Sequence, residues 1–145
     1  MNVKQALKKK NRLVGLINQA YLRASQYNSI ETGNERPYSA KASIQEWMTL
    51  TDELIALKCK IQLANNPVND KIYRLSELKA QAKYLRDLNC TSGVQQRASR
   101  WSNESVVQKE SEISVLERDQ MVEKIEEQIE VIQDELDAWN HKTLV

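Results

Sequence analysis

Apolar residues recur at alternating spacings of three and four along most of the chain, which is the period of amphipathic helices. This pattern predicts helices over residues 3–27, 43–65, 70–89 and 115–140. The first helix carries a seam with coiled-coil spacing, made of Val3, Leu7, Lys10, Val14, Ile17, Tyr21 and Ala24. Leu13, Leu16 and Ala20 widen that stripe. We therefore expect the first helix to meet more than one partner face.

The ends of the helices are marked by capping and turn residues. Ser43 and Glu46 have the spacing of a capping box at the start of the second helix, and Ser114 and Glu117 repeat it before the fourth. Gly93 can take the left-handed conformation that stops a helix. Residues 94–114 lose helical periodicity, and we expect an extended hairpin or an ordered loop there.

The stripes of the later helices point to assembly. The second helix carries Trp47, Leu50, Leu54, Leu57, Ile61 and Ala64, and the fourth carries Val122, Ile125, Ile129, Ile132, Leu136 and Trp139. A seam rich in β-branched residues favours coiled coils of more than two strands. The sequence predicts an all-α fold of long antiparallel helical hairpins in a bundle, with coiled-coil character and a short extended insertion. We expect residues 1–145 to form one domain that is homo-oligomeric.

Composition and charge refine this prediction. Only 3 Gly and 2 Pro interrupt a chain that is 41% hydrophobic and 28% charged, which suits a few long helices. The net charge is +1, but residues 1–27 carry bases without acids, whereas residues 101–145 are strongly acidic. We expect basic and acidic helices to lie against one another. The alternative, a basic arm for DNA or RNA, is disfavoured because the acidic block cancels the positive excess.

Little in the sequence suggests catalysis or a cofactor. His141 is the only histidine, and Cys59 and Cys90 have no metal-ligand spacing. We expect Cys59 to be buried and Cys90 to lie at a helix end. Four acids of the last helix (Glu123, Glu126, Glu127 and Glu130) lack the Glu-x-x-His partner of a di-metal site, so a solvated face is the preferred interpretation. We therefore predict that the protein is not an enzyme and that it binds no metal ion and no cofactor.

Candidate ligand-binding residues lie in the loops. Arg97, Arg100 and Trp101 fall together in the non-helical span, near Lys83 and Arg86 of the third helix. Arginine binds phosphate through its planar fork, and an aromatic ring can stack on a base. Further candidates stand in the first loop and are Arg36 and Tyr38. The alternative is that these aromatic residues anchor loops while the arginines pair with acids.

The chain resembles a family of small helical bacterial and phage proteins labelled septicolysin, over nearly its whole length. The resemblance rests on residues 3–7 (Val-Lys-Gln-Ala-Leu), on residues 31–37, which are similar to a Glu-Gly-x-x-Pro turn, and on the helix end at residues 61–66. It also rests on the leucine-rich basic helix at 75–88 and on Trp139 followed by Asn140, where the family has Asn-Trp. The resemblance implies a homo-oligomer, possibly a hexamer, without established enzymatic activity.

The leading hypothesis from the sequence is a non-enzymatic oligomer that sequesters a small anionic ligand such as a nucleotide immune signal, as phage proteins of this kind do. The first alternative is a structural or protein-interaction coiled-coil module that acts on a host or phage protein. The second is a membrane-active, cytolysin-like protein whose first helix lies on a bilayer. No stretch approaches the ~20 apolar residues of a membrane span, and we expect a cytoplasmic protein.

Overall fold

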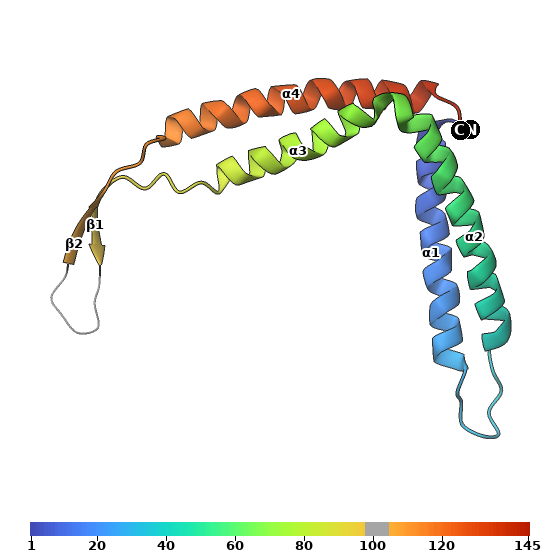
Figure 1. Ribbon diagram of the computed structural model, residues 1–145. Helices are drawn as coiled ribbons and strands as arrows, with labels where there is room; N and C mark the ends of the chain where they lie inside the picture. The colour runs from blue at the N-terminus through green and yellow to red at the C-terminus, as the bar shows by residue number, and fades with distance from the viewer. Residues whose placement is uncertain (98–104) are drawn as a thin grey trace. The chain divides into compact units, whose positions relative to one another are not determined.

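The computed structural model describes the backbone of residues 1–97 and 105–145, and the side chains of residues 1–95 and 106–145. Within these residues the fold is mostly helical with a small antiparallel sheet, as the sequence predicted. The elements are α1 (Val3–Tyr27), α2 (Ala40–Asn65), the 3-10 helix η1 (Asn66–Val68), α3 (Asn69–Arg86), β1 (Gly93–Arg97), β2 (Ser105–Lys109) and α4 (Val115–Lys142) (Figure 1). The chain divides into two compact units, which are residues 1–69 with 136–145 and residues 70–135.

The start of α1 is fixed by a capping box and by the end of the chain. The Asn2 side chain accepts a hydrogen bond from the Gln5 backbone N–H at 2.9 Å, and the Gln5 side chain accepts from the Asn2 N–H at 3.0 Å. Asn2 also forms an antiparallel bridge with Leu144, and the Val3 N–H donates to the Thr143 carbonyl at 2.9 Å. Donors that a helix N-terminus leaves unpaired are thereby satisfied.

The core of the first unit lies between α1 and α2. Its buried cluster consists of Ala6, Leu13, Leu57 and Ile61, with Leu7, Leu50, Leu54 and Val145 packed against it. The buried alanines of α1 allow the two backbones to approach closely. The face of α1 turned to α2 includes Leu13 and Ala20, which widened the predicted stripe, whereas Val14 and Tyr21 of the predicted seam stay exposed.

The beginning of α2 corrects two predictions. The helix starts at Ala40, because the Ser39 hydroxyl accepts from the Ala42 N–H at 3.1 Å. The prediction that Ser43 caps this helix is wrong, since Ser43 lies inside α2 with only 5% of its surface exposed. The prediction that Cys59 is buried is also wrong, because the side chain lies outside the seam that faces α1 and is exposed.

The second unit contains α3 and most of α4. These helices pack less closely than α1 and α2. Basic side chains of α3 reach acids of α4, as the charge pattern predicted: the Lys71 Nζ lies 2.6 Å from the Glu135 Oε2, and Arg86 forms an ion pair with Glu126. The helix α3 ends three residues earlier than the sequence suggested.

The segment between α3 and α4 contains the extended hairpin expected near residues 94–114. The strands β1 and β2 pair antiparallel, with Gly93 opposite Lys109 and Arg97 opposite Ser105. Gly93 has a φ of +96°, a conformation that glycine adopts without the steric cost met by other residues.

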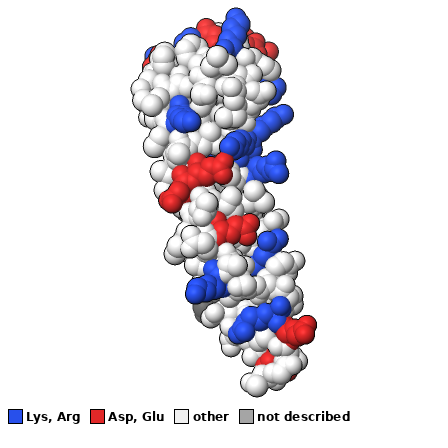
Figure 2. Space-filling view, turned by 90° about the vertical axis from the view of Figure 1, so that its right-hand side faces the viewer, with Lys and Arg blue, Asp and Glu red and all other residues white. Residues whose placement is uncertain are grey.

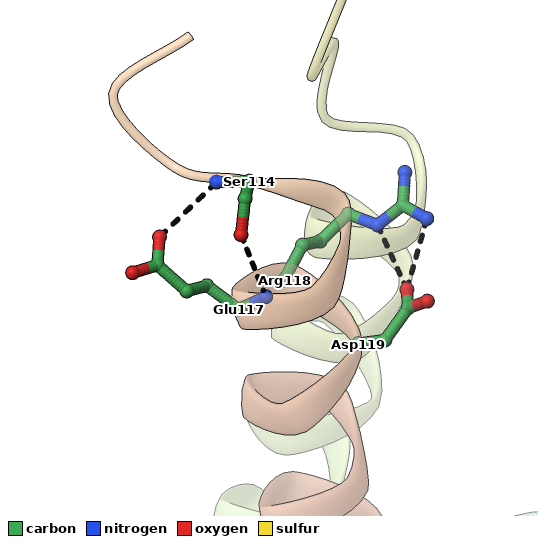
Figure 3. Close-up of polar contacts among 4 residues, drawn as sticks. All are labelled: Ser114, Glu117, Arg118 and Asp119. Atoms are coloured by element: carbon green, nitrogen blue, oxygen red, sulfur yellow. Dashed lines mark hydrogen bonds and ion pairs between the residues drawn. The ribbon is translucent and has the colours of Figure 1, made fainter.

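The first turn of α4 confirms the second predicted capping box (Figure 3). The Ser114 hydroxyl accepts from the Glu117 N–H, and the Glu117 carboxylate accepts from the Ser114 N–H, both at 3.1 Å. The next residue, Arg118, donates from its Nε and Nη2 to one oxygen of Asp119 at 3.0 and 2.9 Å. These hydrogen bonds raise the pKa of Arg118 above its ordinary value, and Cys90 adds to the shift.

Candidate interaction surface

The predicted ligand residues of the hairpin segment fall largely outside the described part of the chain. Arg100 and Trp101 lie outside the described residues. The backbone of Arg97 belongs to β1, and its side chain is outside the described set. The hypothesis that these three residues line a ligand pocket therefore stays a prediction.

The two candidates in the first loop anchor that loop to the helix before it. Arg36 donates from Nε to the Tyr27 carbonyl at 3.0 Å and from Nη2 to the Asn28 carbonyl at 3.1 Å. It thereby satisfies carbonyls at the end of α1 that have no partner within the helix. The centroids of the Tyr38 and Tyr27 rings lie 5.6 Å apart, and the Arg23 guanidinium lies 4.8 Å from the centroid of the Tyr38 ring. These contacts match the loop-anchoring alternative.

The two candidates on α3 lie in the second unit. Arg86 pairs with Glu126 of α4, so its charge has a partner within the chain. Lys83 is exposed one turn earlier on the same helix. This ion pair matches the alternative in which the arginines pair with acids.

One side of the α1–α2 hairpin is charged. The Lys9 Nζ lies 2.6 Å from the Glu53 Oε1, and the Arg23 Nη1 lies 3.9 Å from the Glu46 Oε2. The same side carries a groove of about 520 Å³, lined by Lys8, Lys9, Arg12, Leu13, Leu16, Leu50 and Glu53. We call this side the charged flank.

The other side of the same hairpin is apolar and aromatic. A hollow of about 400 Å³ there is lined by Tyr21, Ala24, Ser25, Asn28, Ile44 and Trp47. Residues at helical spacing continue this surface along both helices. We call it the apolar flank and define it as Val14, Ile17, Tyr21, Ile44, Trp47, Met48 and Ile55. All but the intermediate Ile17 have at least 36% of their surface exposed.

Except for Trp47, the α2 half of the apolar flank was not predicted from the sequence. Ile44, Met48 and Ile55 form a second stripe on α2, offset from the seam of Leu50, Leu54 and Leu57. The spacing 44, 48, 51 and 55 alternates four, three and four, so the periodicity carried the signal. In the space-filling view, uncharged side chains cover much of the face shown, and acidic and basic side chains are scattered over it (Figure 2).

The second unit also has an apolar groove between its helices. Its volume is about 470 Å³, and it is lined by Ala80, Gln81, Tyr84, Leu85, Met121 and Ile125. The Tyr84 and Met121 side chains are exposed there. Among the described residues, the open packing of α3 against α4 leaves this surface uncovered.

Exposed apolar side chains outnumber buried ones in the described part of the molecule. Among those residues, 19 large hydrophobic side chains are exposed, whereas 13 hydrophobic residues are buried and five of these are alanines. Scattered exposed apolar residues are normal in monomers, but a continuous apolar face marks an interaction site or a liability for aggregation. The apolar flank gathers six of these exposed side chains, and three of them, Tyr21, Ile44 and Trp47, line one hollow.

Three further features of the described residues concern metal binding, a buried polar atom and membrane spans. In residues 1–97 and 105–145 no group of three or more His, Cys, Asp or Glu is placed to hold a metal ion. The Trp139 Nε1 is buried without a hydrogen-bond partner within the described structure. None of the helices in this part of the chain is long and apolar enough to cross a membrane.

Comparison of the chain with models of protein families, with curated proteins and with solved structures finds no match. The resemblance to the septicolysin-labelled family therefore stays a prediction.

Proposed function

We propose that this chain is a non-enzymatic, self-associating helical protein, a structural interaction module whose apolar surfaces pair with copies of itself. The observation that carries the proposal is the excess of exposed over buried large apolar side chains, six of which lie on the apolar flank of α1–α2. Removing apolar surface from water is worth about 25 cal/mol per Å². Association would therefore recover a stabilisation that a two-helix hairpin leaves unused.

The packing of the second unit supports the same proposal. The groove beside Tyr84 and Met121 is almost entirely apolar, and it lies between α3 and α4, which pack less closely than α1 and α2. Helical hairpins commonly bury such a groove by adding further helices in a bundle. The β-branched residues of α4, such as Ile125 and Ile129, favour assemblies above the dimer. A hexamer, which the family resemblance implies, is one such assembly.

The test is the mass of the full chain in solution. Sedimentation equilibrium and light scattering across the micromolar range should give a mass that is a multiple of the 16.8 kDa chain. Tyr84→Glu combined with Met121→Glu should lower that mass, because the groove would then carry charge. Leu63→Glu is the matched control, since Leu63 is exposed on α2 outside both surfaces. A monomer at all concentrations would overturn the proposal.

A second candidate function, capture of a small anionic ligand, is favoured by the groove of the charged flank. Lys8 and Arg12 have no ion-pair partner among the described residues, and they stand beside Leu13, Leu16 and Leu50. Positive groups next to an apolar wall suit a ligand with a phosphate and an apolar body, such as a nucleotide. This is the ligand class that the sequence suggested, at different residues.

Calorimetric titration with cyclic and linear adenine and guanine nucleotides tests the second candidate. Lys8→Ala with Arg12→Ala should abolish binding if the groove is the site. Arg100→Ala with Trp101→Ala should abolish it if the hairpin segment is the site. Binding that neither pair changes, or no binding by any nucleotide, would remove the candidate.

A further inference from the structure

Unpaired charges stand at both ends of the apolar flank. At one end, Lys10 and Lys58 continue the two helical stripes of the flank beyond Val14 and Ile55. At the other end, the loop between α1 and α2 carries Glu31 and Glu35, both exposed. These four charged side chains form no ion pair within the described residues. On the charged flank, Lys9 pairs with Glu53 and Arg23 pairs with Glu46, whereas Lys8 and Arg12 form no ion pair within the described residues.

The Tyr21–Trp47 pair lies between these two sets of charges. At 1.5 Å per residue, Lys10 on α1 and Lys58 on α2 each lie about 16 Å from the pair along the helix axes. In the other direction, α1 ends about 9 Å beyond Tyr21 on the same measure, and the loop with Glu31 and Glu35 follows. The two lysines and the acidic loop therefore lie in opposite directions from the aromatic pair along the hairpin.

We propose that the occupant of the apolar flank is the same flank of a second copy, docked antiparallel about a two-fold axis that passes near the Tyr21–Trp47 pair. This inference rests on the proposed self-association and specifies its geometry. A two-fold contact is self-complementary, so each feature at one end meets the feature at the opposite end of its partner. The acidic loop of each copy then lies against the two lysines of the other.

Charge decides between the two directions of docking. In a parallel arrangement Lys10 and Lys58 would face their own copies, and Glu31 and Glu35 would do the same. Like charges brought together at an interface disfavour that arrangement, while opposite charges fix register and direction. Arg36 does not cancel the acids toward a partner, because its guanidinium is directed to the carbonyls of Tyr27 and Asn28. Lys41, which is exposed in the first turn of α2, offsets one of the two acids, so one negative charge is left at this end.

The composition of the flank fits a protein partner. Tyr, Trp and Met are enriched in the buried centre of protein interfaces, whereas charged residues are depleted there and gather at the rim. The flank has this arrangement, with Tyr21, Trp47 and Met48 inside and the four unpaired charges at its ends. Two hairpins joined in this way form an antiparallel four-helix arrangement.

The first experiment tests proximity in the full chain. In a background of Cys59→Ser and Cys90→Ser, Tyr21→Cys treated with a short bis-maleimide should yield a cross-linked dimer, because the axis brings the two copies of this position together. Gln19→Cys is the matched control, since it is an exposed position on α1 that points away from the flank. It should stay uncross-linked under the same conditions.

The second experiment tests direction by exchanging charges. Lys10→Glu with Lys58→Glu should weaken association about tenfold, and Glu31→Lys with Glu35→Lys should do the same. The quadruple variant restores opposite charges, so its dissociation constant should return to within about threefold of the original. Lys60→Glu with Lys79→Glu changes the net charge equally but outside the flank, and it should leave association unchanged. Circular dichroism verifies the helix content of each variant.

The outcomes separate this inference from the proposed function. Cross-linking at position 21 and recovery in the quadruple variant support the antiparallel pairing. A chain that associates while the Tyr21→Cys variant fails to cross-link, or while the charge variants have no effect, overturns the antiparallel pairing and leaves self-association standing. A chain that is monomeric at all concentrations overturns both.

Discussion

The rings of Tyr21 and Trp47 meet across the α1–α2 hairpin with their centroids 6.3 Å apart and their planes tilted by 60°. Tilted pairs of this kind are favourable beyond the apolar area that they cover. The two residues nevertheless stay accessible, since 57% of the surface of Tyr21 and 36% of the surface of Trp47 are exposed. The hairpin therefore has an inner seam of leucine and alanine that holds the helices together, and an outer aromatic layer that is open to a partner.

The inner seam should carry the stability of the hairpin. Leu57 is 5% exposed in the core cluster, whereas Leu63 on the same helix is 69% exposed. Leu57→Ala should lower the free energy of unfolding by about 2–5 kcal/mol, because it leaves a cavity, and Leu63→Ala by less than about 0.5 kcal/mol. Urea denaturation of both variants at one protein concentration measures the difference. Equal losses would contradict the placement of the core.

Local sequence patterns predicted helix ends where no tertiary contact competed with them. The Ser114–Glu117 box forms as expected, but the same spacing at Ser43 and Glu46 lies inside α2. A serine followed by an acid three residues later occurs on a helix face as readily as at the start of a helix. The start of α2 is set by Ser39, whose hydroxyl caps the helix one turn before Ser43, and Ser43 therefore lies on the buried face.

The candidate surface was less predictable than the helices. Periodicity placed Trp47 on an apolar stripe, but it could not divide the wide stripes between a seam and an exposed flank. That division depends on the small side chains of α1, such as Ala20 and Ala24, which bring α2 close and leave Val14 and Tyr21 at the margin. Likewise, Arg36 and Tyr38 stood out in the sequence, while their contacts with Tyr27 arise from the path of the loop.

Arg36 should stabilise the end of α1. Arg36→Ala removes two hydrogen bonds to the carbonyls of Tyr27 and Asn28, which should cost about 1 kcal/mol at this exposed position. Amide hydrogen exchange in the last turn of α1 should accelerate accordingly. Arg36→Lys should restore only part of the protection, because an ammonium group lacks the planar fork. Unchanged exchange in Arg36→Ala would contradict the anchoring role.

Ser114 should stabilise the start of α4. Ser114→Ala removes the acceptor for the Glu117 N–H, and a lost N-cap costs about 1 kcal/mol of unfolding free energy. Ser114→Asp should retain the stability, since aspartate is an equally good N-cap and its charge suits the helix N-terminus. Ser76→Ala, within α3, serves as the control and should be neutral or slightly stabilising. If Ser114→Ala melts at the same temperature as the unmodified chain, the capping box has no energetic role.

The Lys71–Glu135 pair gives the second unit a pH dependence at alkaline pH. The hydrogen bond to Glu135 raises the pKa of Lys71 above its ordinary value of 10.5, partial burial opposes the shift, and the charges of Glu135 and Asp70 add to it. Because the folded-state pKa is the higher one, the stabilisation is fully present below 10.5 and is lost as the pH rises through the folded-state value. Both side chains are well exposed, so the effect is small and falls with salt.

Lys71→Gln isolates this contribution. The unfolding free energy of the variant should fall below that of the unmodified chain at neutral pH, and the two should converge as the pH rises above 10.5, where the unmodified chain loses its ion pair. Lys79→Gln is the control, because Lys79 is exposed on the same helix and forms no ion pair within the described residues. Denaturant titrations at neutral and alkaline pH measure all three chains. If the difference in unfolding free energy between Lys71→Gln and the unmodified chain stays constant across this pH range, the charge of Lys71 does not act through Glu135.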